Sequence, residues 1–238
     1  MGGFKRAAVI GSSGGVGGAL ARRLADAGAA VHAFSRSGGV TDSRMVGGPI
    51  DLLKEKTIAA AAAGLGDDAE LDLVIVATGL LHDGALSPEK AFRDLEGPKL
   101  ARYFAVNTIG PALVAKHFLP LLRRSGTPVF AALSARVGSI GDNRLGGWYG
   151  YRASKAALNM TIKTLAIELA RTRPNAICVA LHPGTVDTPL SKPFQRGVAE
   201  GRLFKPEMSA ERLLEVVANL RAEDSGSCIG WDGATIVP

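Results

Sequence analysis

Cysteine is scarce in this 238-residue sequence, which has only Cys178 and Cys228, both in apolar, strand-like segments. Thiols in such surroundings are typical of buried small hydrophobic residues, so we expect neither a disulfide nor a metal site. Long apolar runs are also missing, because none approaches the ~18 residues of a membrane-spanning helix. The first six residues lead directly into a strand-like run and lack the pattern of a signal peptide. We therefore expect a cytoplasmic protein with no membrane partner.

Aromatic residues make up only 5% of the chain, and Lys and Arg are scattered, although the formal net charge is +6. Proteins that bind nucleic acid usually gather basic residues on one face and interleave aromatic residues for stacking. The scattered charge does not predict such a surface, and we expect no nucleic-acid partner. The scattered positive charge is still compatible with a local pocket that binds an anionic ligand.

Glycine and apolar residues are abundant, with 30 glycines and a hydrophobic fraction of 47%. A chain of this length can bury one large core, and no linker or internal repeat divides it. Strands are predicted at 7–10, 30–34, 46–50, 73–76, 129–133, 176–181 and 228–231, and helices at 16–27, 59–63, 100–122, 152–170 and 210–220. This alternation predicts an α/β fold in which residues 1–238 form one domain. We expect a doubly wound (Rossmann-like) parallel sheet with helices on both faces.

A glycine-rich stretch, Gly11-Ser12-Ser13-Gly14-Gly15-Val16-Gly17-Gly18, connects the first predicted strand to the first helix. Glycines here let the backbone turn sharply and approach a pyrophosphate, whose charge is favoured at a helix N-terminus. The spacing Gly11-x-x-x-Gly15-x-Gly17 is one residue longer at its start than the common dinucleotide fingerprint. Because of its place between strand and helix, we interpret the stretch as a dinucleotide-binding turn formed by Gly11, Ser12, Ser13, Gly15, Val16 and Gly17.

Tyr151 and Lys155 lie four residues apart at the start of a predicted helix. On a helix this spacing places both side chains on one face, about one turn apart. Free tyrosine has a pKa near ~10, and a nearby ammonium favours the phenolate, so we expect Lys155 to lower the pKa of Tyr151. Such a pair can act as a general acid or base.

Together, the glycine spacing and the Tyr151-x-x-x-Lys155 pair resemble the short-chain dehydrogenase/reductase family, over nearly the whole chain. Within the family, the sequence looks most like the C-factor-type members. The motifs behind this narrower resemblance are Ser-Ala-Arg-Val-Gly-Ser-Ile at 134–140, Tyr-Arg-Ala-Ser-Lys-Ala-Ala-Leu-Asn at 151–159, His-Pro-Gly-Thr-Val-Asp-Thr at 182–188 and Trp-Asp-Gly at 231–233. Several independent motifs in the expected order make the family-level resemblance specific.

The resemblance implies a role for each matched residue. Tyr151 would exchange a proton with the substrate oxygen, while Lys155 would assist it and bind the nicotinamide ribose. Asn107 matches the family's helix asparagine, which supports a water near the lysine. In this chain, Pro183-Gly184-x-Val186-x-Thr188 matches the family's segment that closes over the nicotinamide. The implied cofactor site also includes Ala77, Thr78 and Gly79, although the family normally has Asn-Asn-Ala-Gly where this chain has Val-Ala-Thr-Gly at 76–79.

A second departure from the family pattern concerns the catalytic serine. The family usually places it three residues before a glycine that is Gly138 here, and this chain has Ala135 in that slot. We predict that Ser134 serves instead, with Ser139 as the second candidate and a site without a serine as the third alternative. Neighbouring strand residues face opposite ways, so Ser134 can serve only if the strand end bulges or turns.

The end of the second predicted strand bears on the choice of cofactor. A carboxylate there would bind the adenosine ribose and repel a 2′-phosphate, but the sequence reads Ser35-Arg36-Ser37. Arginine can bind phosphate through two parallel hydrogen bonds, so we predict NADP(H) rather than NAD(H). Asp51 and Leu52 resemble the family's adenine-contacting pair.

Residues 188–207 are rich in Pro, Gly and charge, and we expect a substrate lid there because the family has one at this position. An apolar carbonyl or alcohol substrate is suggested by the candidate pocket walls Trp148, Tyr149, Leu190, Phe194 and Phe204. By analogy with the family, the helices at 100–122 and 152–170 would form a homodimer or homotetramer.

These observations predict an oxidoreductase that transfers hydride between NADP(H) and a carbonyl or alcohol, with Tyr151 as general acid/base assisted by Lys155. The alternative is a catalytically weak dinucleotide-binding signalling or regulatory protein of C-factor type, which the missing serine favours. Retention of both Tyr151 and Lys155 favours the enzyme.

Overall fold

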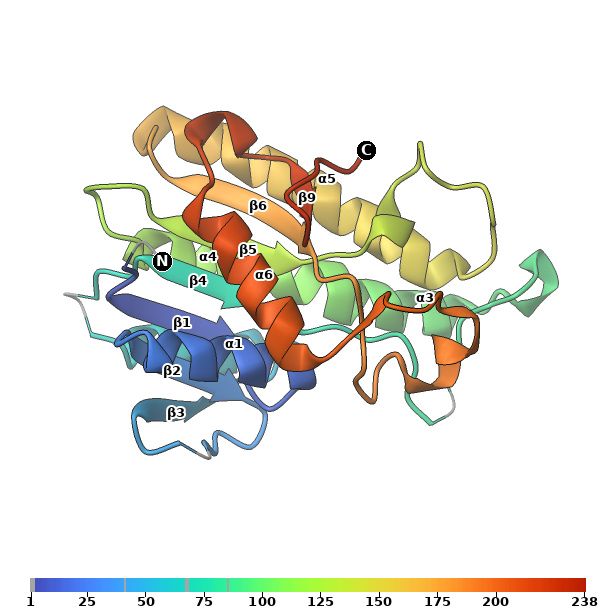
Figure 1. The fold of residues 1–238 in the computed structure, drawn as a ribbon, viewed down its shortest axis with the longest axis horizontal. Coiled ribbons are helices and arrows are strands. Elements are labelled where there is room, and N and C mark those ends of the chain that lie inside the picture. The colour runs from blue at the N-terminus through green and yellow to red at the C-terminus, as the bar shows by residue number, and fades with distance from the viewer. Residues whose placement is uncertain (1–2, 41, 67–68, 85) are drawn as a thin grey trace.

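The computed structural model describes residues 3–40, 42–66, 69–84 and 86–238. Its central element is a seven-stranded sheet in the order β3-β2-β1-β4-β5-β6-β9 (Figure 1). The strands are β1 (Arg6–Ile10), β2 (Ala30–Ser35), β3 (Met45–Pro49), β4 (Leu73–Val76), β5 (Val129–Leu133), β6 (Ile177–His182) and β9 (Cys228–Gly230). Every neighbouring pair is parallel, which confirms the predicted doubly wound fold.

Helices cover both faces of the sheet. On one face lie α1 (Gly15–Asp26) and α6 (Pro206–Ala218), and on the other α2 (Glu55–Ala63), α4 (Gly110–Phe118) and α5 (Tyr149–Thr172). Successive strand residues alternate between the two cores: Ala7 and Val9 face α1 and α6, whereas Ala8 and Ile10 face the opposite core. Because both faces are buried, strands need apolar side chains at every position, which is why β4 reads Leu-Val-Ile-Val.

The long helix predicted over 100–122 is interrupted in the structure. It consists of α3 (Gly97–Phe104), a π-helical turn at Ala105–Ile109, α4, and a 3₁₀ turn at Leu119–Leu121. Asn107 lies within the π turn and is fully buried. Its side-chain amide accepts a hydrogen bond from the Leu80 N–H (2.8 Å) and donates one to the Leu80 carbonyl (2.9 Å). Widened helical turns of this kind are frequent at functional sites. Here the turn carries Asn107, whose side chain holds the loop after β4 by hydrogen bonds.

The segment predicted to form a lid contains regular structure that the sequence did not indicate. β7 (Thr185–Val186) and β8 (Leu203–Phe204) pair as a separate two-stranded parallel sheet, with a 3₁₀ helix at Lys192–Gly197 between them. Further 3₁₀ turns lie at Phe92–Asp94, Arg136–Gly138 and Ala222–Asp224. Of these two strands, only β8 lies within the predicted lid, residues 188–207, and the short sheet joins it to the residues just before the segment, close to the end of β6.

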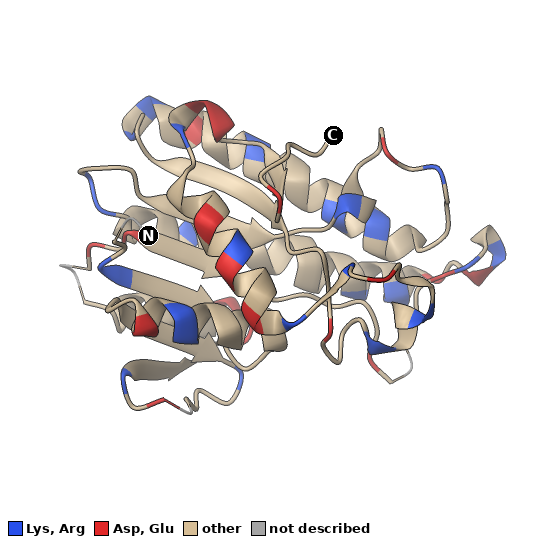
Figure 2. Cartoon of the chain, viewed as in Figure 1, with Lys and Arg blue, Asp and Glu red and all other residues tan. Residues whose placement is uncertain are grey.

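Lys and Arg are spread over helices and loops from different parts of the chain, with Asp and Glu among them (Figure 2). Several form exposed ion pairs, such as Arg23 with Glu211 between α1 and α6. Within the described residues, no helix combines the length and apolar character needed to cross a bilayer.

The order of the strands determines where a ligand can bind. The chain runs outward from β1 through β2 to β3 on one side, and through β4 to β5 and β6 on the other. Open α/β sheets bind ligands outside the carboxyl ends of their strands, at the point where the order reverses. This point lies between β1 and β4, so the turns after β1, β4, β5 and β6 border the expected crevice.

Candidate active site

The glycine turn after β1 folds back tightly beneath the start of α1. Gly11 has a positive φ of 96°, and its N–H and that of Ser12 donate to the Phe34 carbonyl of β2, at 2.8 and 3.0 Å. A Cβ built on Gly17 would lie only 2.2 Å from the Gly11 carbonyl oxygen, so a larger residue does not fit there without a shift. These two glycines allow the close backbone approach that a dinucleotide-binding turn requires.

The N-terminus of α1 is suited to an anionic group. Its first turn has neither a side-chain cap nor an acidic residue, so the positive end of the helix dipole is not compensated there. Ser13 is exposed beside this turn and Val16 is half-buried. A Cβ on Gly15 would lie 2.6 Å from Thr188 Cγ2, which brings the glycine turn against the segment after β6.

The segment after β6 is held in place by close packing. Gly184 has a positive φ of 78°, and a Cβ there would lie 2.6 Å from the Phe204 ring. The Pro183 carbonyl accepts a hydrogen bond from Ser209 Oγ (2.8 Å), and Val186 is buried. The structure therefore places the predicted residues from Pro183 to Thr188 beside the glycine turn.

The loop after β4 meets the helix that carries the predicted catalytic pair. The Ala77 N–H donates to the Ile10 carbonyl (2.7 Å), which joins this loop to the end of β1. A Cβ on Gly79 would lie 3.8 Å from Lys155 Nζ and 3.9 Å from Asn107 Oδ1. The Thr78 hydroxyl is also buried and has no hydrogen-bond partner among the described residues.

Tyr151 and Lys155 lie in the first two turns of α5, and both are buried, with 7% and 2% of their surface exposed. Lys155 Nζ donates to the Leu133 carbonyl at the end of β5 (2.8 Å) and lies 5.9 Å from the centroid of the Tyr151 ring. The pair predicted from the spacing is therefore brought together at the crevice. Its ammonium binds a strand end rather than the phenol oxygen.

Burial shifts the two pKa values in opposite directions. Loss of water around the phenol raises the pKa of Tyr151 to about 12. Loss of water around the ammonium lowers the pKa of Lys155 to about 8. The shift for Tyr151 is opposite to the one expected from the sequence. In this structure desolvation outweighs the attraction of a cation that makes no hydrogen bond to the phenol.

The hydroxyls of the two candidate serines make hydrogen bonds to other residues. Ser134 Oγ donates to Asn159 Oδ1 of α5 (2.6 Å), and Ser139 Oγ accepts the N–H of Asp142 (3.0 Å). Ala135, which occupies the family's serine slot, packs in the same apolar cluster as Tyr151. The strand end therefore turns an alanine methyl, and not the Ser134 hydroxyl, toward the tyrosine.

Apolar and aromatic side chains surround Tyr151. Trp148 contacts both Tyr151 and Phe194, with ring centroids 6.2 and 5.0 Å apart, and it is the only non-glycine residue with positive φ (51°) in the described chain. The predicted walls Trp148, Leu190 and Phe194 belong to this cluster, and Phe204 packs instead on Trp231. Sequence reasoning missed Leu80, Leu81, Leu86, Tyr103, Val106 and Val137, although Leu80 and Leu81 directly follow the Gly79 motif.

The predicted lid segment contacts this cluster from outside. Phe194, in the 3₁₀ helix Lys192–Gly197, also packs on His82, with ring centroids 5.7 Å apart. His82 Nε2 lies 3.0 Å from the Pro189 carbonyl, a hydrogen bond in which the ring N–H donates. These contacts fix the segment over the wall of the crevice.

At the end of β2, Ser35 is buried and its hydroxyl accepts the Gly38 N–H (3.1 Å). Arg36 is exposed and makes no ion pair with any described residue, so its guanidinium is available to a ligand. After β3, Asp51 Oδ1 accepts the Leu53 N–H (3.1 Å), and Leu52 is buried against Gly110 of α4. The residues predicted to recognise the adenosine end therefore lie on loops that follow β2 and β3.

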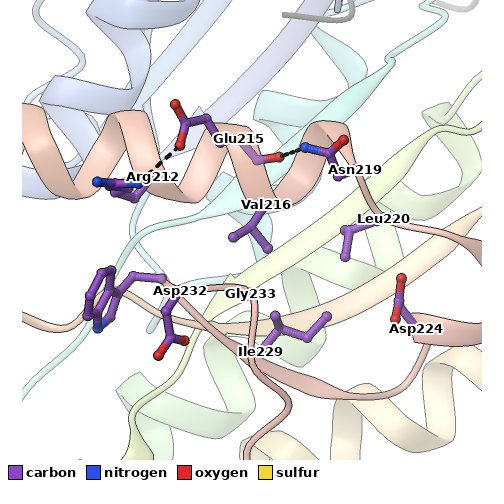
Figure 3. A pocket seen from close by; sticks show the side chains of 10 residues that line it. Arg212, Glu215, Val216, Asn219, Leu220, Asp224, Ile229, Asp232 and Gly233 are labelled. Atoms are coloured by element: carbon purple, nitrogen blue, oxygen red, sulfur yellow. Dashed lines mark hydrogen bonds and ion pairs between the residues drawn. The ribbon is translucent and has the colours of Figure 1, made fainter.

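A cavity of about 300 Å³ opens elsewhere, between α6 and the chain around β9 (Figure 3). Its lining includes Arg212 and Val216 from α6, Ile229 from β9, and Asp232 beyond it. None of the predicted site residues lines this cavity, so it is separate from the crevice.

The strand order, the glycine turn and the buried tyrosine–lysine pair define an α/β oxidoreductase of the Rossmann type. The family model of the short chain dehydrogenases matches residues 5–199, and the chain belongs to this family.

Individual relatives agree with this assignment. The chain is 35% identical to C-signal of Myxococcus xanthus over 147 residues, 61% of this chain and 82% of that protein, in line with the C-factor-type resemblance. It is 31% identical to 1-hydroxy-2-glutathionyl-2-methyl-3-butene dehydrogenase of Rhodococcus sp. (strain AD45) over 229 residues, 94% of this chain and 96% of that protein. The NADPH-bound carbonyl reductase from chicken fatty liver matches with a TM-score of 0.85 at 25% identity over 99% of both chains.

Tyr151 of the cofactor-free protein is expected to keep its proton to higher pH than free tyrosine, because burial raises its pKa to about 12. The difference in phenolate absorbance between wild type and Tyr151→Phe should be absent at pH ~10, where half of free tyrosine is ionised. Circular dichroism at the same pH serves as the control for intact folding. A difference signal with a midpoint below pH ~9 would mean that the Lys155 charge outweighs burial.

Proposed function

We propose that this protein is an NADP-dependent carbonyl reductase or alcohol dehydrogenase that transfers hydride between the cofactor and a carbonyl carbon. The observation that carries the proposal is the position of Tyr151 and Lys155. Both are buried at the carboxyl edge of the sheet, with Gly79 and Asn107 next to the ammonium. In this position the phenol would face the crevice bordered by the glycine turn.

The residues around the crevice fit a phosphorylated dinucleotide. The uncapped first turn of α1 suits the pyrophosphate, and the guanidinium of Arg36, which makes no ion pair with any described residue, suits a 2′-phosphate. The buried hydroxyl of Thr78, which has no partner among the described residues, is available to hydrogen-bond the ligand. Asp51 and Leu52 would contact the adenine, and Pro183, Gly184, Val186 and Thr188 the carboxamide. The bound cofactor supplies the hydride, and the NADPH-bound reductase from chicken supports this choice.

Tyr151 would act as the general acid of the reduction. With a pKa of about 12, the phenol carries its proton at neutral pH and would donate it to the substrate oxygen as negative charge develops there. The pKa of Lys155 is lowered to about 8, so its ammonium still predominates near neutral pH. From 5.9 Å, this positive charge would stabilise the phenolate left after proton transfer.

The walls of the crevice favour an apolar carbonyl substrate. The cluster around Tyr151 contains leucines, aromatic rings and the methyl of Ala135, and the segment 188–207 would act as its lid. Ala135 offers no hydrogen bond to the substrate oxygen, so turnover is expected to be slow. We further propose a homo-oligomer, because the exposed Met160 and Ile167 on α5 are apolar side chains that a second copy could bury.

The second candidate function is a dinucleotide-binding signalling or regulatory protein with weak catalysis. Ala135 in the serine slot supports it, as does the similarity to C-signal. The two functions make different demands on Tyr151, because only the enzyme needs its hydroxyl.

NADPH oxidation should be measured against a panel of aldehydes, ketones and quinones, with Tyr151→Phe beside the wild type. We expect kcat/KM to fall by about 10²- to 10⁴-fold in this variant, because the proton donor is lost. NADPH affinity should stay unchanged. Tyr149→Phe is the matched control, since Tyr149 is 38% exposed, lies outside the cluster around Tyr151 and has Ala153 rather than a lysine four residues on. NADPH binding without any Tyr151-dependent turnover would favour the regulatory function.

Ala135→Ser should raise kcat by about 10- to 100-fold, because it adds a hydrogen-bond donor next to Tyr151. Ser134→Ala is the matched control. Its hydroxyl binds Asn159, so the substitution should lower the melting temperature and change kcat by less than about threefold. A loss of turnover in Ser134→Ala with unchanged stability would instead identify Ser134 as the catalytic serine.

Arg36→Asp should weaken NADPH binding by about 10- to 100-fold, because a charged hydrogen-bond donor is replaced by a repelling carboxylate. NADH binding should not weaken. Calorimetric titration with both cofactors measures the two affinities, and Arg93→Asp, a change of the same charge on an exposed turn, is the control. Tighter binding of NADH than of NADPH to the wild type would contradict the predicted cofactor preference.

A further inference from the structure

Glu89 is an acidic residue in the interior, with only 3% of its surface exposed. It lies in the loop between β4 and α3, more than sixty positions before Tyr151 in the sequence. A buried carboxylate requires hydrogen-bond partners, because it loses its hydration. Its partners therefore show what the residue does.

Those partners lie at the start of α5. Glu89 Oε2 accepts the N–H of Gly150 (3.0 Å), and the Glu89 backbone carbonyl accepts the N–H of Trp148 (2.5 Å). One residue thus binds two of the N–H groups that a helix leaves without partners at its N-terminus. The negative charge of the carboxylate also lies at the positive end of the helix dipole.

The start of α5 has no cap of its own. Its N-cap residue, Trp148, makes no side-chain capping hydrogen bond and adopts a left-handed conformation with φ 51° and ψ 41°. This conformation is unfavourable for a bulky side chain and persists only where surrounding contacts impose it. The two hydrogen bonds that Glu89 accepts are contacts of this kind. They hold Trp148 and Gly150, which flank the first helical residue, Tyr149.

Glu89 and Tyr103 leave no space at the helix start. A Cβ on Gly150 would lie 2.4 Å from Tyr103 Cδ2 and 3.0 Å from Glu89 Oε1. The Tyr103 ring in turn packs against Tyr151, with centroids 6.3 Å apart, and its hydroxyl donates to the Leu81 carbonyl (2.7 Å). The backbone just before the catalytic tyrosine is therefore enclosed by side chains from two other elements.

We propose that Glu89 is a positioning residue for Tyr151: by binding the N–H groups of Trp148 and Gly150, it fixes the first turn of α5 and with it the place of the phenol in the crevice. This inference rests on the proposed function. The carboxylate itself does not touch the reacting atoms. Its Oε1 has no partner in the described chain, so a single acceptor oxygen performs the capping.

If Glu89 caps the helix, two substitutions at this position should differ in their effect on the start of α5. Glu89→Gln keeps an oxygen that can accept the Gly150 N–H, whereas Glu89→Ala removes it. The matched control is Glu96→Ala, which removes an exposed carboxylate that pairs with Lys99 on the surface. Should Glu89→Ala not fold, Glu89→Asp replaces it, because its carboxylate is one methylene too short to reach Gly150.

Hydrogen exchange of the cofactor-free protein is the first measurement, since it does not depend on turnover. We expect amide exchange in residues 148–152 to accelerate by at least about tenfold in Glu89→Ala, because the capping hydrogen bond is lost. Glu89→Gln and Glu96→Ala should match the wild type. Unchanged exchange in Glu89→Ala, or an equal increase in Glu89→Gln, would overturn the proposal.

Steady-state kinetics is the second measurement. Misplacement of the phenol should lower kcat by about 10- to 100-fold in Glu89→Ala, with KM for NADPH within about twofold of wild type, and Glu89→Gln should restore kcat. Equal kcat values in Glu89→Ala and Glu96→Ala would overturn the positioning role. If wild type turns over no carbonyl, the proposed function fails, while the exchange data still decide whether Glu89 holds the helix start.

Discussion

The buried ammonium of Lys155 is the constraint on which the rest of the site depends. A cation removed from water needs a polar partner, and Nζ finds one in the Leu133 carbonyl at the end of β5. To reach it, α5 has to lie close to the turn after this strand, where a Cβ on Gly138 would come within 2.8 Å of Lys155 Cβ. The same approach carries Tyr151 to the crevice and Lys155 Nζ toward Gly79. The place of the proposed catalytic pair thus follows from the packing of one helix against two strand ends.

Burial also determines which chemistry the proposed site is prepared for. With its pKa raised to about 12, the Tyr151 phenol keeps its proton at neutral pH, so in the proposed reaction the cofactor-free protein would offer a proton donor rather than a base. The apolar side chains packed around Tyr151 act in the same direction, because a low-polarity environment favours the neutral phenol over the phenolate. With Ala135 in place of a serine, the substrate oxygen in the proposed reaction would depend more heavily on that single donor. The position of the first turn of α5, which we propose that Glu89 fixes, would then matter more for turnover.

The fold could be predicted because its signals are local. Apolar runs of strand length, glycines at turns and helical periodicity each depend on a few neighbouring residues, and the structure confirms the doubly wound sheet. The π turn at Asn107 and the pairing of β7 with β8 were missed. Asn107 leaves the regular helix to bind Leu80, and β7 pairs with a segment 18 residues further along the chain. Neither partner can be identified from the periodicity of one segment.

Sequence alone determined the family, the parallel α/β fold and the residue types at the site, because spacing along the chain places Tyr151 and Lys155 on one helix face. Tertiary structure decided the direction of the Tyr151 pKa shift, the attachment of Ser134 to Asn159, and the contact of Glu89 with the start of α5. Each of these depends on how completely water is excluded or on which distant residue lies within hydrogen-bond distance. Both are properties of the packed molecule, because burial and long-range contacts arise only when separate elements come together.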